Sequence, residues 1–269
     1  EVIRSERGSE YCCYDMRYES DSSCMFQYIH SHPVQAGERV LSSLLESVRD
    51  KLYVLNARPA DAEHISRYIS AKVTDNLNSI MGSRVLAELL SYDTLTINHK
   101  EYLNLPRLSG MFAHEHLAAV FSGDTYCDIH GDLTIENIIC TGGDGGFYLI
   151  DPNPGNIHES SFLDYAKLLQ SLHGGYEFMM KTDSVSVSGS SIDFVYTRSA
   201  VYDRLYSFLL DYFEEHFTPQ EVRSIFYHEL VHWLRLMPYK LRKDARRAPM
   251  FYAGLVMAAN DVYNRFEKN

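Results

Sequence analysis

The sequence predicts an α+β fold that is mainly helical, with short strands at the start and near the centre of the chain. Apolar residues recur at spacings of three and four over most of the 269 residues, which is typical of helices that bury one face. Two runs near the first residue and two near residue 140 have the composition of short strands. Hydrophobic residues make up 45% of the chain, which is enough for a substantial core.

The first part of the chain is predicted to form a β-hairpin followed by helices. Residues 2–5 and 11–18 have strand composition and are joined by a turn around Gly8. Helical periodicity then continues to about residue 122. The expected helices cover residues 23–31, 37–55, 60–81 and 114–123.

The centre of the chain is predicted to be a second hairpin, and helices follow it. Residues 137–140 and 147–151 are apolar runs joined by Thr-Gly-Gly-Asp-Gly-Gly, a sequence suited to a hairpin turn. Residues 181–194 are rich in serine and are expected to be a polar loop. The expected later helices cover residues 161–175, 200–216, 219–237 and 250–266.

Charge and composition narrow the class of partner. The formal net charge is -11, so the average field repels nucleic acid and anionic membranes. No apolar run approaches the roughly 20 residues that span a bilayer, and no signal-peptide pattern is present. The five cysteines show neither disulfide-scaffold nor CxxC spacing. We therefore expect a cytoplasmic protein with reduced thiols, no membrane span, no nucleic acid partner and a small-molecule ligand.

Four polar residues flank the central hairpin. His130, Asp132 and Asn137 lie on the loop before it, and Asp151 follows it. Because a hairpin brings its two ends together, these side chains are expected to converge.

The motifs that carry these residues resemble a known family. His-Gly-Asp-Leu-Thr-Ile-Glu-Asn-Ile-Ile, followed by Leu-Ile-Asp, resembles the catalytic loop and metal-binding aspartate of the aminoglycoside and choline phosphotransferases, small-molecule kinases with a protein-kinase-like fold. The resemblance implies that Asp132 orients the acceptor hydroxyl or accepts its proton. It also implies that Asn137 and Asp151 hold Mg²⁺ against the phosphates of ATP, and that His130 is a packed structural support.

The resemblance extends to both sides of these motifs. Leu-Asp-Tyr-Ala-Lys-Leu-Leu-Gln-Ser-Leu-His-Gly-Gly-Tyr-Glu-Phe resembles the helix after the metal site, where family members carry an aspartate that braces the catalytic loop; here it is Asp164. The first hairpin and Tyr-Asp-Met-Arg-Tyr-Glu resemble the end of the small lobe and the hinge that meets adenine. The residues implied for nucleotide binding are Met16, Arg17 and Glu19.

The resemblance implies two unequal parts. Residues 1–22 would be a remnant of the small lobe and hinge, and residues 23–269 a mainly helical large lobe with a short catalytic hairpin. The chain begins at Glu1 and has no lysine before Lys51, whereas the family's small lobe is a five-stranded sheet with a lysine that binds phosphate. We therefore expect an upstream segment or fused domain, and we expect residues 1–269 alone to bind ATP weakly and to turn over negligibly.

The function implied is ATP-dependent phosphoryl transfer to a hydroxyl of a small molecule. The helix that contains Asp164 resembles kinases of bacterial surface-polysaccharide metabolism, which favours a sugar or sugar derivative as acceptor. An alternative is a kinase-like module that binds nucleotide or a partner without turnover. Intact Asp132, Asn137 and Asp151 argue against that alternative.

A second alternative arises from a different motif. His228, Glu229 and His232 form His-Glu-Leu-Val-His, the H-E-x-x-H pattern of zinc metallohydrolases. Such an enzyme needs a third metal ligand, yet no histidine follows His232. Glu267, the single glutamate downstream of it, lies two residues from the end. The sequence therefore favours an ordinary helix of the large lobe here.

Overall fold

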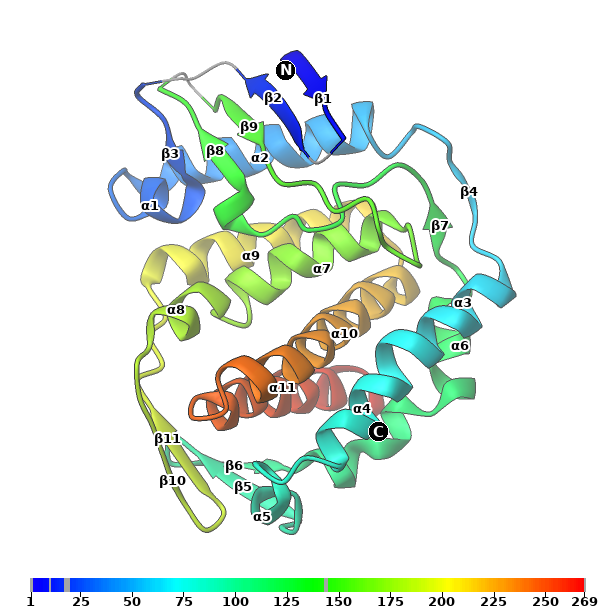
Figure 1. The fold of residues 1–269 in the computed structure, drawn as a ribbon, viewed down its shortest axis with the longest axis vertical. Coiled ribbons are helices and arrows are strands. Elements are labelled where there is room, and N and C mark those ends of the chain that lie inside the picture. The colour runs from blue at the N-terminus through cyan, green and yellow to red at the C-terminus, as the bar shows by residue number, and fades with distance from the viewer. Residues whose placement is uncertain (1, 10, 17–19, 143–144, 269) are drawn as a thin grey trace.

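The structure, a computed structural model, describes residues 2–9, 11–16, 20–142 and 145–268. These residues form a helical core with small sheets at its edges (Figure 1). This arrangement confirms the mainly helical α+β class. The helices are α1 Met25–Ile29, α2 Val34–Lys51, α3 Ala62–Ile69, α4 Asp75–Met81, α5 Ala87–Leu90, α6 His114–Phe121, α7 Ser161–Leu172, α8 Tyr176–Lys181, α9 Ala200–His216, α10 Pro219–Lys243 and α11 Ala248–Val262.

The strands form separate small sheets rather than one large sheet. The antiparallel pair β1–β2 forms a sheet of its own, β3 joins β8 and β9, β4 pairs with β7, and the order β10-β11-β5-β6 makes a four-stranded sheet. The strands are β1 Val2–Arg7, β2 Cys12–Met16, β3 Ser23–Cys24, β4 Arg58–Pro59, β5 Thr94–Ile97, β6 Lys100–Leu103, β7 Thr125–Tyr126, β8 Ile138–Cys140, β9 Phe147–Leu149, β10 Val185–Ser188 and β11 Ser191–Phe194.

The core is centred on α10 and α11. Helix α10 begins with a capping box in which Thr218 and Glu221 satisfy each other's backbone N–H groups, and it packs against α7, α11 and α4. Its middle turns, including Trp233, are buried on several sides. Figure 1 shows α7 and α9 on one side of this pair and α3, α4 and α6 on another. The middle of α10 therefore belongs to the core rather than to the surface.

Two segments differ from the sequence expectation. Residues 181–194 are not a loop, because β10 and β11 form a hairpin that turns at Gly189, with φ of 55°. Strand β11 also pairs in parallel with β5, and Ile192 is fully buried there. The partner strand that stabilises this hairpin lies some 90 residues earlier in the chain, so no local pattern identifies it.

The second difference is the hairpin β5–β6, in a region expected to be mostly helical. Leu95 and Ile97 alternate with half-buried threonines, which is the period of a strand. Asn98 and His99 both have positive φ, at 46° and 67°, as a two-residue turn of type I′ requires. The prediction of mostly helical structure was therefore wrong for residues 94–103, where the turn residues and the pairing of β5 with β11 favour a hairpin.

The predicted boundary between residues 22 and 23 stays a prediction. Strands β1 and β2 pair with each other, whereas β3 pairs with β8.

No helix in the described part of the chain is long and apolar enough to cross a membrane.

Candidate active site

The hairpin β8–β9 brings the two predicted metal ligands to one end. Ile138 lies opposite Leu149 in this antiparallel pair, and the backbone N–H of Ile150 donates to the carbonyl of Asn137 at 3.0 Å. Asn137 precedes β8, and Asp151 follows Ile150, so both lie where the hairpin opens.

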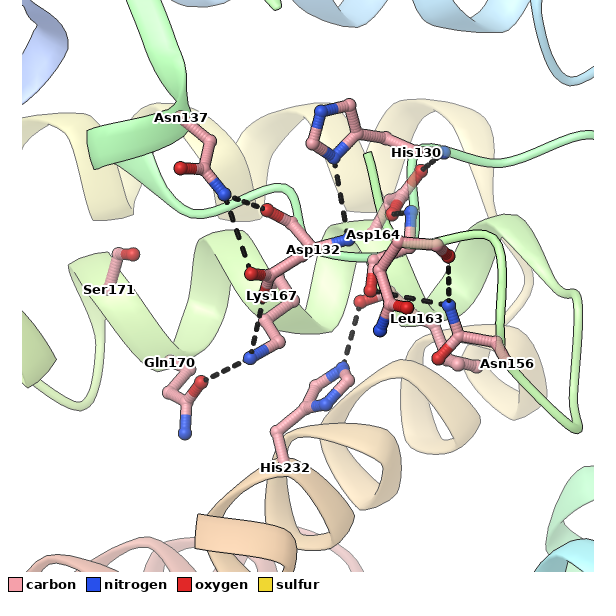
Figure 2. Close-up of polar contacts among 12 residues, drawn as sticks. His130, Asp132, Asn137, Asn156, Leu163, Asp164, Lys167, Gln170, Ser171 and His232 are labelled. Carbon is pink, nitrogen blue, oxygen red and sulfur yellow. Dashed lines mark hydrogen bonds and ion pairs between the residues drawn. The ribbon is translucent and has the colours of Figure 1, made fainter. Parts of the chain in front are cut away.

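Asp164 holds the loop that precedes this hairpin. It lies in the first turn of α7 and is fully buried. Its carboxylate accepts a hydrogen bond from the backbone N–H of His130 at 2.8 Å (Figure 2). It also accepts from the backbone N–H of Gly131 at 2.7 Å and from the Tyr53 hydroxyl at 3.1 Å. Burial raises the pKa of Asp164 to about 6, although these hydrogen bonds favour the charged form.

His130 is buried and both of its ring nitrogens are engaged. Nε2 donates to the carbonyl of Ile150 at 2.9 Å, and Nδ1 accepts from the backbone N–H of Asp132 at 3.4 Å. Because a carbonyl can only accept, Nε2 is the donor in this hydrogen bond. The side chain therefore ties the loop to the segment after β9 and is not placed to act as a base.

The residue between His130 and Asp132 must be glycine. Gly131 has φ of 81°, and a Cβ atom there would collide with the Asn156 side chain and the Asn153 carbonyl. The backbone N–H of Asn153 donates to the carbonyl of His130 at 2.8 Å. The loop is thus packed between α7 on one side and residues 153–156 on the other.

Asp132 and Asn137 face each other across the loop. The Asn137 Nδ2 donates to the backbone carbonyl of Asp132 at 2.8 Å and lies 3.4 Å from Asp132 Oδ2. Among the described residues, no group donates a hydrogen bond to Asn137 Oδ1. Asp151 is exposed and has φ of 53°, a left-handed conformation that is uncommon outside glycine. Amide and carboxylate oxygens are the ligands that Mg²⁺ prefers, so this donor set fits Mg²⁺.

Lys167 is a site residue that the sequence reasoning missed. It lies one turn beyond Asp164 on α7, and its Nζ is 3.0 Å from Asp132 Oδ1 and 3.2 Å from Gln170 Oε1 (Figure 2). Burial lowers the pKa of Lys167, and the charge of Asp132 opposes that shift. Lys167 follows Asp164 by three positions, a spacing that places both side chains on one helix face. This spacing could have indicated from the sequence that Lys167 lies near the loop that Asp164 holds.

A buried hydrogen-bond network connects helices α7, α8 and α9 to the loop that contains Asp132. The Ser171 hydroxyl donates to Glu177 Oε1 at 2.7 Å and accepts from the backbone N–H of Ile135 at 3.4 Å. The Tyr202 hydroxyl donates to Glu177 Oε2 at 3.1 Å. Burial raises the pKa of Glu177, which is fully buried. Helices α7, α8 and α9 are therefore all linked to the segment that carries Asp132.

Only one of the three residues expected to meet adenine lies within the described part of the chain. Met16 is the last residue of β2, while Arg17 and Glu19 lie outside the described residues. Their role in nucleotide binding stays a prediction.

The H-E-x-x-H residues on α10 do not aim at one point. His228 Nε2 donates to Asp124 at 2.8 Å, and His232 Nε2 donates to the carbonyl of Leu163 at 3.0 Å. Glu229 accepts from His173 Nδ1 at 2.9 Å. A zinc hydrolase needs both imidazoles on a single ion, so this geometry argues against the zinc alternative.

One cluster of zinc-type ligands does occur among the described residues: Asp124, His158 and His228, all buried. Asp124 Oδ2 accepts from His158 Nε2 at 2.6 Å and from His228 Nε2 at 2.8 Å, and Oδ1 accepts from Ser224 at 2.6 Å. Burial opposes the charge on Asp124, but the two imidazoles outweigh it and lower its pKa to about 2.

The same cluster is closed by two tyrosines. The hydroxyls of Tyr126 and Tyr68 lie 3.0 Å from the Nδ1 atoms of His158 and His228 respectively. All donors in the cluster thus have acceptors, and it offers three side-chain ligands where a structural zinc site usually has four. We interpret it as a structural hydrogen-bond network.

Two of the cavities in the described part of the chain lie apart from the carboxylates of the candidate site. One of about 300 Å³ lies between β6, the end of α7 and α11, and its lining includes His173, Tyr196 and Asp261. Another of about 290 Å³ lies behind the loop and is lined in part by Asp128 and Asn156. Asp132, Asn137 and Asp151 line neither cavity.

Comparisons with known proteins identify a similar fold. No protein-family model matches the chain, and no curated protein matches it by sequence. Among solved structures, a glucosamine kinase crystal structure matches with a TM-score of 0.57 and 14% sequence identity, over 93% of this chain and 61% of that chain. The fold therefore resembles that of a small-molecule kinase, and the chain spans less than two thirds of the length of that structure.

Proposed function

We propose that this chain carries the catalytic loop and metal site of an ATP-dependent phosphotransferase that acts on a hydroxyl group of a small molecule. The observation that carries the proposal is the arrangement of Asp132, Asn137 and Asp151 at one end of β8–β9, on a loop held by Asp164. The likeness to a glucosamine kinase supports a sugar or sugar derivative as acceptor.

The proposed reaction requires positioning more than covalent catalysis. The acceptor oxygen forms a bond to the γ-phosphorus, the bond from that phosphorus to the β–γ bridging oxygen breaks, and the hydroxyl proton passes to Asp132. The products are ADP and the phosphorylated acceptor. When bound, Mg²⁺ neutralises charge on the phosphates, and Asn137 Oδ1 and the Asp151 carboxylate are the residues that would hold it.

The contacts around Asp132 support the part that we propose for it. Its Oδ1 is paired with Lys167 and its Oδ2 faces Asn137, and the side chain is 40% exposed. An oxygen of this carboxylate can orient the acceptor hydroxyl through a hydrogen bond and receive its proton as the P–O bond forms.

The test uses the complete natural protein, with any residues that precede Glu1 in its gene. Transfer from γ-labelled ATP is measured with Mg²⁺ and a panel of sugars, amino sugars and non-sugar alcohols. Asp132→Asn should reduce transfer by roughly two to four orders of magnitude and leave Mg-ATP affinity largely intact. Asp128→Asn is the matched control, because this carboxylate lies on the same segment but pairs with Asn56.

Each alternative outcome has a distinct meaning. Transfer to a non-sugar alcohol would correct the acceptor class. Tight Mg-ATP binding without transfer to any acceptor would favour the non-catalytic binding module. Near-normal transfer by Asp132→Asn would remove Asp132 from its proposed role.

A further inference from the structure

The side-chain amine of Lys167 has two polar partners in the structure, although it carries three N–H donors. Its side chain is 18% exposed and ends in two polar contacts, Asp132 Oδ1 at 3.0 Å and Gln170 Oε1 at 3.2 Å. An ammonium group has three N–H donors. Within the part of the chain that the structure describes, the third donor has no hydrogen-bond partner.

The cost of burying this lysine indicates a use for its charge. Burial disfavours an ammonium group unless a partner compensates, and the compensating partner here is the carboxylate proposed to meet the acceptor. An ion pair that served only the fold could form with any nearby carboxylate, whereas Lys167 pairs with Asp132. Gln170 lies one turn from Lys167 on α7 and holds the amine in place, as Figure 2 shows.

We propose that Lys167 contacts the phosphoryl group during its transfer and donates its third N–H to a phosphoryl oxygen beside Asp132. This inference rests on the proposed function. The group in transfer lies in line between the acceptor oxygen and ADP, so a cation 3.0 Å from Asp132 Oδ1 adjoins its acceptor side. Mg²⁺ at Asn137 and Asp151 would neutralise charge on the ADP side.

This position predicts that Lys167 acts on the transition state more than on bound nucleotide. A donor fixed in advance toward developing charge lowers the barrier without tightening ground-state binding. Loss of one such donor commonly costs about 10²–10³ in kcat. Mg-ADP, which lacks the γ-phosphoryl group, should be bound equally well with or without Lys167.

The experiment compares two probes in the complete natural protein: Mg-ADP alone, and Mg-ADP with fluoroaluminate, which mimics the phosphoryl group in transfer. The variants are Lys167→Met, Lys167→Gln and Lys167→Arg. Lys181→Met is the matched control, because Lys181 is a more exposed lysine that pairs with Glu136 at 3.2 Å and not with Asp132. Calorimetry gives the two affinities, and ADP release gives kcat and KM.

We expect Lys167→Met and Lys167→Gln to bind Mg-ADP within about twofold of wild type but to lose at least about tenfold in affinity for the fluoroaluminate complex. Their kcat should fall by about 10²-fold or more, with KM for ATP little changed. Lys167→Arg should recover part of kcat because it keeps the charge. Lys181→Met should match wild type.

Other results would overturn the inference. Equal losses for both probes would mean that Lys167 serves the fold, and wild-type affinities in both neutral variants would remove it from the reaction. Gln keeps a donor for Asp132, so it decides the case if Lys167→Met does not fold. A wild-type protein that transfers no phosphoryl group would instead contradict the proposed function, and the inference would fall with it.

Discussion

At the scale of single residues, the buried carboxylate of Asp164 holds the backbone of the loop in the candidate site. It accepts from two successive backbone N–H groups, of His130 and Gly131, and no other group replaces it there. Because a buried N–H without an acceptor costs about 1–3 kcal/mol, one side chain on α7 determines the path of the loop that carries Asp132.

The first prediction follows from these two hydrogen bonds. Asp164→Ala should lower the free energy of unfolding by roughly 2–5 kcal/mol and speed hydrogen exchange at the amides of His130 and Gly131. Urea unfolding and amide exchange measure the two effects. Asp193→Ala, on the half-buried strand β11, is the control and should change both little. Unchanged exchange at the two amides would show that Asp164 does not hold the loop.

At the scale of elements, the network around Asp124 connects segments that are distant in sequence. Asp124 precedes β7, His158 precedes α7, and His228 and Ser224 lie on α10. Each buried donor that loses its acceptor costs about 1–3 kcal/mol, and Asp124 accepts from three donors. The network therefore joins α10 to the strand and loop that lead into the candidate site.

The second prediction separates this network from a metal site. The purified protein should contain no stoichiometric zinc, and addition of a chelator should leave the urea unfolding midpoint unchanged. Asp124→Ala should destabilise the protein by roughly 3–5 kcal/mol, because it leaves three buried donors without an acceptor. One tightly held zinc ion per chain that is lost in His228→Ala would contradict our interpretation. His232→Ala is the matched control, because its ring bonds to the carbonyl of Leu163 and not to Asp124.

At the scale of the whole molecule, an ion-pair cluster joins the three central helices. His173 follows α7, and its ring pairs with Glu229 of α10 at 2.9 Å and with Asp261 of α11 at 3.4 Å. Burial opposes a charge on His173, but the two carboxylates outweigh it and raise its pKa to about 9. His173 is therefore charged in the folded protein at neutral pH.

The third prediction is a pH dependence of stability. The folded pKa of about 9 exceeds the ordinary value of 6.5, so the stabilisation from His173 is complete below pH 6.5 and is lost as the pH rises through about 9. The expected loss is roughly 3 kcal/mol. Urea unfolding at pH 6 and pH 9.5 measures it. His173→Gln should destabilise the protein at pH 6 and should lack this part of the decline; an equal effect at both pH values would contradict the assignment.

Most helices and the central hairpin could be predicted because their signals are local. The apolar periodicity of residues 161–175 and 200–216 reflects one face buried on the core, and the structure has α7 and α9 there. The order of His130, Asp132, Asn137 and Asp151 around a hairpin was enough to expect that they converge, because a hairpin brings its own ends together.

What the sequence alone determined is thus most of the helices and the polar residues that adjoin one hairpin, since both depend on neighbours a few positions apart. The tertiary structure alone decided which distant partner each group meets. It paired β11 with β5, directed His228 to Asp124 rather than toward a shared metal with His232, and placed Lys167 against Asp132. Such choices depend on how whole helices and strands pack, and no short-range pattern encodes them.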